Sequence, residues 1–407
     1  MVDFVYQKFY DQYKPECYEQ YLQNLSETIG VSYKFSSTPI LISSEQWERL
    51  RETTTAVLDL LRSSEYQSSI AKQSWFLPVQ PLTENDFYGC VDFHLGSDEE
   101  KIIEVNFFPP GFSSVAELME RTFIKHFQLP QKGLFEGFEE LLISAITDNY
   151  SHSKVAVSDI SIDQQYTLGE FYYLLKLMQQ HGVDAQLCNA ERVAISPDGY
   201  PVWHNQEFKR VYSRLIPYDW EYSKERLGCY TEMYTKHPEI FFTNPFGWRL
   251  ADKRFLSVLS TLQDGDYGLD VVSVASIRRA TLVTRMLQDF VDLQSVKDCF
   301  GSVKNIIVKP VDNFAGHGVL LKPTVGGLER LLSNDKARNN YVVQQLFPAD
   351  KLRYITDAGK QEPMKYDVRV VFLRGNVVGA YGRVYEGSIT NFRSEAGGFA
   401  PVLVYEK

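Results

Sequence analysis

Three oxygen-bearing side chains cluster in one stretch of the chain, GCVDFHLGSDEEKIIEVN, in a pattern suited to holding a metal ion. Glu104 and Asn106 are two residues apart, so they share a face of the strand predicted here, and Asp92 lies on the partner strand across a turn. Carboxylate and amide oxygens suit Mg²⁺, which also binds phosphates. The alternative is a polar strand face in water. Flanking apolar residues weaken it, because an unpaired carboxylate on a buried strand is costly.

A lysine and two glycines form a second candidate site. Lys309 ends the apolar strand NIIVKP, and the loop from Asp312 to Gly318 that follows it contains Gly316. A lysine beside a glycine loop can neutralise phosphate oxygens while backbone N–H groups cover them. A solvated turn with an exposed lysine gives the same pattern, so both interpretations are compatible with it.

Charged residues near the end of the chain form a third candidate site. Asp367 and Arg369 are two apart on a predicted strand, Arg383 lies on the next strand, and Asn391 follows with Gly397-Gly398 beyond it. Cations beside a phosphate site would stabilise the charge of a transferred phosphoryl group. An internal ion pair on the face shared by Asp367 and Arg369 explains the same spacing equally well.

Length and composition exclude several classes of protein. A chain of 407 residues is long enough for about two to three domains. Lys and Arg total 42 against 52 for Asp and Glu, and the net charge of -10 disfavours binding to nucleic acid or to anionic lipid. The five cysteines are widely spaced, and no signal peptide or membrane-spanning run is present, so we expect a cytoplasmic protein without a membrane partner.

The elements that must position these residues fall into three successive regions. The first contains helices, a short strand after Pro39, a helix from about Glu45 that Ser44 could cap, and the hairpin with the candidate metal ligands. A capping box at residues 114–117 predicts a further helix. From Lys154, strands alternate with a helix, which predicts a parallel α/β layer. The third region begins near Asn244 and contains the glycine loop and a run of strands.

Several of these segments resemble the ATP-grasp superfamily. LADKRFLSVLSTL is similar to the family's helix with the first nucleotide lysine, IIVKPVDNFAGHGV to its second lysine and phosphate loop, and YVVQQLF to the strand that holds adenine. The stretch YDVRVVFLRGNVVGAYGRV, followed by Asn391, is similar to the core of glutathione synthetases and related peptide ligases. The nucleotide-binding residues that this resemblance implies are Lys253, Lys309, Gly316, Gly318, Gln344 and Leu346.

The order of the segments resembles circularly permuted ATP-grasp proteins. The family's metal-binding Asp and E-x-N strand normally come last, but here the matching Asp92, Glu104 and Asn106 come before the other segments. Relatives often carry an Arg two residues before the metal-binding Asp, where this chain has Cys90. A phosphate or substrate contact is therefore missing here, or is supplied by Arg369 or Arg383.

The resemblance implies an α/β fold with a permuted ATP-grasp core. The expected domains are a helical extension (1–44), the permuted carboxyl-terminal part with the metal-binding hairpin (45–112), a helical segment (113–152), an α/β lobe (153–243) and the nucleotide-binding lobes (244–407). The implied function is an ATP-dependent carboxylate-amine ligase that uses Mg²⁺ and an acyl phosphate, with a small molecule or a peptide as substrate. The catalytic residues would be Arg369, Arg383 and Asn391. The alternative is a nucleotide-binding regulatory or assembly protein without ligase activity.

Overall fold

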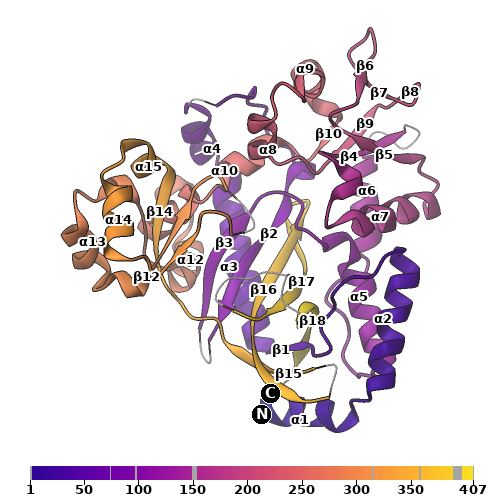
Figure 1. Cartoon of the computed structure of the whole chain (residues 1–407), viewed down its shortest axis with the longest axis horizontal. Helices are drawn as coiled ribbons and strands as arrows, with labels where there is room; N and C mark the ends of the chain where they lie inside the picture. Colours follow the sequence, from indigo (N-terminus) through magenta and orange to yellow (C-terminus); the bar gives the residue numbers. More distant parts are fainter. Residues whose placement is uncertain are drawn as a thin grey trace.

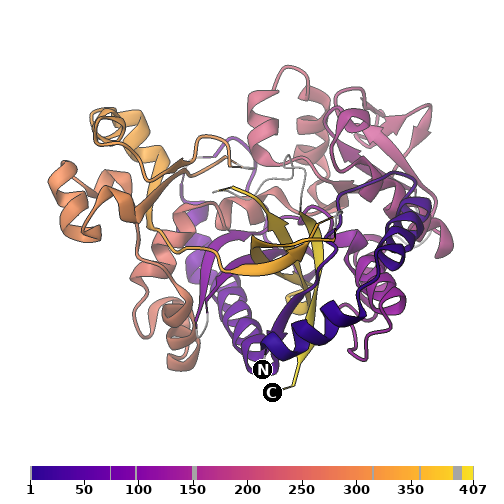
Figure 2. The same ribbon diagram turned by 60° about the horizontal axis from the view of Figure 1, so that its bottom comes forward.

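The computed structural model describes residues 2–73, 75–96, 99–148, 154–313, 316–356, 359–387 and 397–406. It has a mixed α/β fold, as the sequence predicts. A large sheet occupies the middle, with a small lobe on one side and an α/β lobe on the other (Figure 1). The view turned by 60° shows the same three bodies (Figure 2).

The large sheet contains seven strands from both ends of the chain. They are β1 (Ile40–Ser43), β2 (Tyr88–Leu95), β3 (Glu100–Asn106), β15 (Lys351–Ile355), β16 (Gln361–Leu373), β17 (Asn376–Tyr385) and β18 (Gly398–Tyr405). Their order is β1, β18, β17, β16, β2 and β3, and β15 also pairs with β16. β2 runs antiparallel to β16, with Asp92 opposite Arg369. This pairing places the hairpin from the first part of the chain against a strand near the end of the chain.

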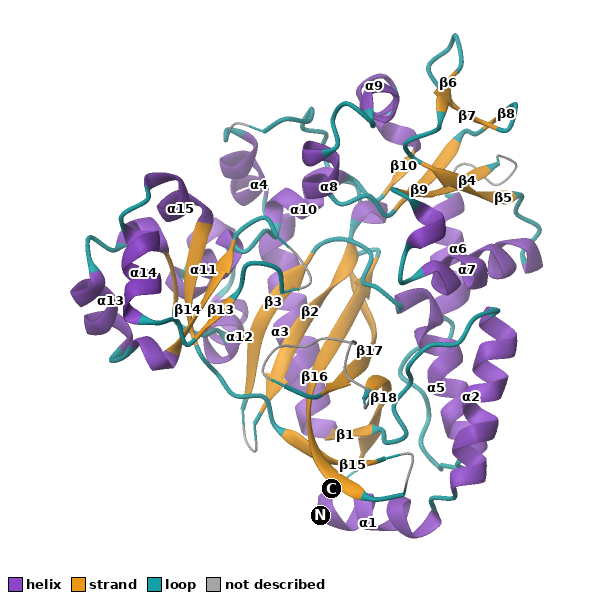
Figure 3. Ribbon diagram, viewed as in Figure 1, coloured by secondary structure: helices purple, strands orange, loops and turns teal. Residues whose placement is uncertain are grey.

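Helices cover both faces of the large sheet. Those of the first region are α1 (Val2–Gln12), α2 (Pro15–Ile29), α3 (Ser44–Arg62), α4 (Ser64–Ala71), α5 (Ala116–His126) and α6 (Phe138–Thr147). Val91 and Phe93 of β2 pack in one core with α3, whereas Tyr88 and Cys90 belong to the core that contains α2 and α5. Figure 3 shows α3 behind the sheet and α2 and α5 beside it. Alternate side chains of β2 therefore serve different cores, as the two-residue period of a strand requires.

The α/β lobe confirms the predicted parallel layer. Its main strands are β4 (Val155–Asp159), β5 (Ala185–Asn189), β9 (Arg210–Ser213) and β10 (Phe241–Phe242), and all neighbouring pairs are parallel. A small antiparallel sheet consists of β6 (Ala194–Ile195), β7 (Pro201–Trp203) and β8 (Gln206–Glu207). The helices that follow residue 154 in this part are α7 (Leu168–Gln180), α8 (Pro217–Tyr222), α9 (Gly228–Lys236) and α10 (Pro245–Leu250).

The small lobe carries the glycine loop on an antiparallel sheet. Its strands are β11 (Thr284–Met286), β12 (Ile306–Pro310), β13 (Leu320–Leu321) and β14 (Tyr341–Gln345), in the order β11, β14, β12 and β13. The helices of this region are α11 (Arg254–Thr261), α12 (Val271–Ala280), α13 (Leu293–Phe300), α14 (Val325–Leu332) and α15 (Asp335–Asn340). Within the described ranges, no helix is both long enough and apolar enough to cross a membrane.

Two helix starts differ from the sequence-based predictions. Ser43, not Ser44, caps α3. Its hydroxyl oxygen accepts a hydrogen bond from the backbone N–H of Gln46, and the Gln46 side-chain oxygen accepts one from the backbone N–H of Ser43. The predicted capping box at residues 114–117 does not form, since α5 begins only at Ala116. The Ser114 hydroxyl instead donates to Glu170 of α7 at 3.2 Å. Ser114 therefore bonds to a residue distant in sequence instead of capping its own helix.

Gly89 of β2 has no room for a side chain next to the strand pairing that holds the candidate metal ligands. A Cβ at this position would clash with the Asn106 carbonyl oxygen and lie 2.6 Å from the Phe372 ring. We therefore expect Gly89→Ala to destabilise the protein by about 1–3 kcal/mol, the usual cost of overpacking a core, and to lower the melting temperature in calorimetry. Gly228→Ala is the matched control, because no atom lies within 4 Å of the added carbon. Equal melting temperatures for the two variants would contradict this account of the hairpin.

Candidate functional site

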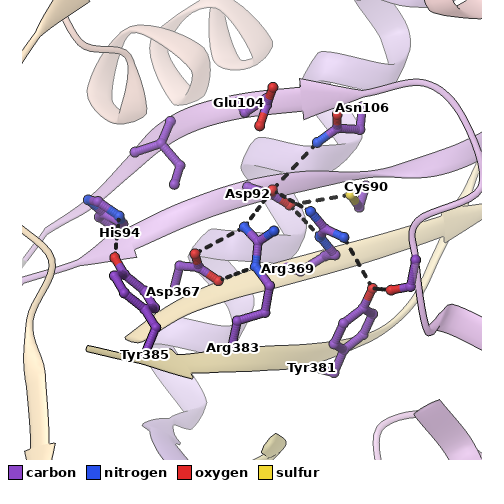
Figure 4. A network of polar contacts seen from close by, with 12 residues as sticks. Cys90, Asp92, His94, Glu104, Asn106, Asp367, Arg369, Tyr381, Arg383 and Tyr385 are labelled. Atoms are coloured by element: carbon purple, nitrogen blue, oxygen red, sulfur yellow. Dashed lines mark hydrogen bonds and ion pairs between the residues drawn. The ribbon is translucent and has the colours of Figure 1, made fainter. Parts of the chain in front are cut away.

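The face of the large sheet opposite α3 carries a row of polar side chains (Figure 4). They occupy alternate positions on neighbouring strands, so they share one face. We call this set the polar face. Its members are Cys90, Asp92 and His94 on β2, Glu104 and Asn106 on β3, Asp367 and Arg369 on β16, and Tyr381, Arg383 and Tyr385 on β17.

Asp92 lies at the centre of the polar face and contacts two arginines. Arg369 makes a two-point contact, with Nε 2.8 Å from Oδ1 and Nη2 2.8 Å from Oδ2, and Arg383 Nη2 lies 2.9 Å from Oδ2. Complete burial by itself would raise the pKa of the Asp92 carboxyl, but the two guanidinium groups outweigh it and hold this pKa well below its usual value. Asp92 is therefore a buried anion that fixes two cations.

Asp367 forms an ion pair with a different partner from the one that its spacing predicts. It accepts hydrogen bonds from Nε and Nη2 of Arg383, at 2.8 and 3.0 Å, rather than from Arg369 on its own strand. Directly opposite residues on neighbouring strands are closer than residues two apart along one strand, and Asp367 lies opposite Arg383. The expected pair of Asp367 with Arg369 is therefore wrong, because both residues form their ion pairs across strands, Asp367 with Arg383 and Arg369 with Asp92.

Tyr381 is a member of the polar face that the sequence reasoning missed. Its hydroxyl accepts a hydrogen bond from Arg369 Nη1 at 3.4 Å and donates one to the Gly111 carbonyl oxygen at 2.6 Å. It thereby connects the arginine to the segment that follows β3. Its alternation with Arg383 along one strand is a signal for this position, but with 25 tyrosines in the chain that signal is weak.

His94, also missed, connects the polar face to the segment that leaves the small lobe. Its Nδ1 lies 3.0 Å from the carbonyl oxygen of Phe347, just after β14, and its Nε2 lies 3.4 Å from the Tyr385 hydroxyl. Burial lowers the pKa of His94, which favours a neutral ring. A neutral ring that donates from Nδ1 can accept from the tyrosine at Nε2.

Lys309 projects from β12 of the small lobe towards β3. Its Nζ donates to the carbonyl oxygen of Ile103 at 2.8 Å and to Oε1 of Gln344 at 2.7 Å. Burial lowers its pKa to about 8, although the nearby carboxylate of Glu104 opposes this shift. The lysine thus lies where the small lobe meets the polar face, not at a solvated turn.

Lys253, the residue immediately before α11, contacts the same strand. Its Nζ lies 3.0 Å from Oε1 of Glu104 and also donates to the carbonyl oxygen of Asn313. Burial would raise the pKa of Glu104, but the lysine ammonium outweighs it and the pKa is lowered. Consecutive residues of β3, Ile103 and Glu104, therefore contact the two lysines of the candidate nucleotide site.

The burial pattern of β14 is compatible with Gln344 as the residue of this strand that contacts adenine. The Gln344 side chain is 2% exposed and contacts Lys309, whereas Gln345 is exposed. The backbone N–H of Leu346 donates to the carbonyl oxygen of Asn305 at 2.7 Å. Contact of Gln344 and Leu346 with adenine stays a prediction.

The glycine loop is described only in part, because residues 314–315 lie outside the described ranges. Gly316 and Gly318 both have a φ of 73°, in the left-handed region that favours glycine. Asn391 also lies outside the described residues, so its predicted catalytic role is untested.

The three candidate metal ligands fit Mg²⁺ unequally. Glu104 and Asn106 share one face of β3, and the Glu104 side chain is 28% exposed, so a cation can reach these two residues. Both oxygens of Asp92 already accept from arginines, and Cys90 Sγ lies 3.3 Å from Oδ1. In the part of the chain that the structure describes, no three His, Cys, Asp or Glu side chains are grouped as a metal site. Metal binding by this set stays a prediction, and Asp92 is the member that fits it least.

Comparison with known proteins gives a structural match without a sequence match. No family model matches the chain, and no curated protein matches it. An apo structure of a glutathione synthetase-like effector, GSS30, from Globodera pallida has a TM-score of 0.61 at 9% identity, covering 97% of this chain and 98% of that one. A putative gamma-glutamylcysteine synthetase from Methylobacillus flagellatus has a TM-score of 0.44 at 12% identity, covering 91% of this chain and 90% of that one. Over nearly its whole length, this chain therefore shares the fold of a glutathione synthetase-like protein.

Proposed function

We propose that the protein is an ATP-dependent ligase that joins a carboxylate to an amine through an acyl phosphate, with an amino acid or a peptide as substrate. The observation that carries this proposal is the meeting of Lys253 and Lys309 with β3, next to Glu104 and Asn106. Two lysines, one on β12 of the small lobe and one just before α11, face an acidic and an amide side chain of β3, and this arrangement suits a triphosphate with its metal ion.

The fold supports an ATP-grasp core with permuted strand order. The E-x-N hairpin comes early in the chain, yet β2 pairs with β16, whose Arg369 is 277 residues from Asp92. This pairing is expected if the strands that normally end the family's core come at the beginning of the chain and still pair with the rest of that core. The structural likeness to a glutathione synthetase-like protein agrees with a peptide-ligase type of activity.

The charges around the candidate site also suit a polyphosphate. Among the described side chains, four cations, Lys253, Lys309, Arg369 and Arg383, lie near three carboxylates, Asp92, Glu104 and Asp367, so these seven groups carry a net charge of one positive. In a buried site this excess favours an anion. The lysines would bind the phosphates directly. The two arginines, held by aspartates, would act through their field on charge that develops during phosphoryl transfer.

The other residues have supporting roles in the proposed reaction. Gln344 would accept from adenine, and the loop with Gly316 and Gly318 would cover the phosphates and keep water from the acyl phosphate. Glu104 and Asn106 would hold Mg²⁺, which neutralises phosphate charge when bound. No step of this proposal requires Asp92 as a ligand.

One observation favours the second candidate function, a nucleotide-binding regulatory or assembly protein without ligase activity. Asp92, one of the three expected metal ligands, already forms ion pairs with Arg369 and Arg383. A site with fewer metal ligands could bind nucleotide without turning it over.

Phosphate release distinguishes the two functions. The purified protein is incubated with ATP and Mg²⁺ across a panel of amino acids and dipeptides. A ligase releases phosphate only when a suitable carboxylate and amine are both present. Nucleotide binding in calorimetry without phosphate release from any pair would support the second function.

A further inference from the structure

Both lysines of the candidate nucleotide site are occupied by the protein itself. Each Nζ donates to a backbone carbonyl, Lys309 to Ile103 and Lys253 to Asn313; Lys309 also donates to the Gln344 side chain, and Lys253 pairs with the Glu104 carboxylate. These contacts differ in kind. A backbone carbonyl is neutral and fixed in its strand, whereas the Glu104 carboxylate is charged and sits on a side chain that can rotate.

We infer that Glu104 makes nucleotide binding depend on a divalent cation: without the cation it stays paired with Lys253 and repels the phosphates, and with the cation it turns to the metal and releases Lys253. This inference rests on the proposed function, because it takes the proposed nucleotide site as given. It adds a second role for Glu104, as the residue that selects metal-bound over metal-free nucleotide.

Competition for one ammonium group is the physical basis of this selection. A phosphate oxygen and the Glu104 carboxylate are both anions that need the same position next to Lys253 Nζ. If a bare nucleotide displaced the carboxylate, a partly buried anion would lose its partner beside a second anion, which is costly. A divalent cation between Glu104 and the phosphates turns that repulsion into attraction.

Of the three carboxylates near the lysines and arginines, Asp92, Glu104 and Asp367, Glu104 is best able to change partners. Its side chain is 28% exposed and pairs with one lysine, at 3.0 Å. Asp92 and Asp367 have no exposed surface, and each is held by at least two arginine hydrogen bonds. Glu104 also lies on β3, at the edge of the large sheet, two residues from Asn106 on the same face.

The test is calorimetric titration with a non-hydrolysable ATP analogue, with Mg²⁺ or with EDTA, on the wild type and on Glu104→Gln. We expect the wild type to bind at least about tenfold more tightly with Mg²⁺, within the range of ordinary coupling between two ligands. Glu104→Gln should bind about fivefold or more tightly than the wild type in EDTA, and its response to Mg²⁺ should fall below about twofold. The variant removes one charge with little change in shape.

Glu99→Gln is the matched control, because Glu99 is an exposed residue of the same hairpin and pairs with Lys101 at 3.1 Å. It should behave as the wild type. Should the glutamine variant fail to fold, Glu104→Met removes the same charge at similar length and takes its place.

Three results would overturn the inference. The first is equal affinity of the wild type for the ATP analogue in Mg²⁺ and in EDTA. The second is a Glu104→Gln or Glu104→Met variant that binds the analogue in EDTA no more tightly than the wild type does. Both leave the proposed nucleotide site standing. Absence of binding by both proteins in both conditions would overturn the inference and the proposed function together.

Discussion

Replacing Asp92 by asparagine is expected to destabilise the protein by about 3–5 kcal/mol, the usual effect of removing one partner of a buried ion pair. The variant leaves Arg369 without its carboxylate partner and leaves Arg383 with Asp367 alone. Chemical denaturation followed by circular dichroism measures the loss. Because the folded-state pKa of Asp92 is depressed, its contribution is present above about pH 4, the usual pKa of aspartate, and is lost as pH falls below that value.

Glu48→Gln is the control for this substitution. Glu48 pairs with Arg51 on the surface, with both side chains about half exposed at 57% and 49%, and such pairs contribute roughly 0–1 kcal/mol. The gap between wild type and Asp92→Asn should narrow as pH falls below about 4. An asparagine variant as stable as Glu48→Gln at pH 7 would show that Asp92 does not organise the two arginines.

Replacing Lys309 by methionine is expected to weaken ATP binding by at least about tenfold, or about 1.4 kcal/mol. Methionine keeps most of the side-chain volume but removes the ammonium group that would neutralise phosphate oxygens. The effect is measured by calorimetric titration of the folded variant with Mg-ATP at pH 7, where a lysine with a pKa of about 8 is mostly charged.

Lys336→Met provides the comparison, because Lys336 is an exposed lysine on α15 of the same lobe. It should bind ATP as the wild type does, since loss of a distant, solvated charge is screened by salt. Unchanged binding by a folded Lys309→Met variant would remove Lys309 from the nucleotide site.

The sequence predicts those parts of the fold that depend on local periodicity. The β2–β3 hairpin, the parallel layer of the α/β lobe and the shared face of Glu104 and Asn106 follow from alternation of side chains and from turn residues. Predictions of single caps are less secure. Ser43 and Ser44 are chemically equivalent, and only the position of Gln46 three residues on decides between them.

The partners within the polar face depend on distant pairing and could not be read from local patterns. Asp92 meets Arg369 across 277 residues, and Asp367 prefers Arg383 because the register of β16 and β17 places them opposite each other. The same reason explains why Tyr381 and His94 were missed. Their neighbours are set by strand order, which local spacing does not encode.

Isotope transfer tests the central claim, ligation through an acyl phosphate, most directly. Amino acids and dipeptides labelled with ¹⁸O in their carboxyl groups are supplied together with Mg-ATP, and the released phosphate is analysed by mass spectrometry. If a carboxylate attacks the γ-phosphoryl group and an amine then displaces the phosphate, one labelled oxygen must leave with it. We predict ADP together with phosphate that carries one ¹⁸O. ADP with unlabelled phosphate, or no ADP with any of the substrates, would contradict the proposed function.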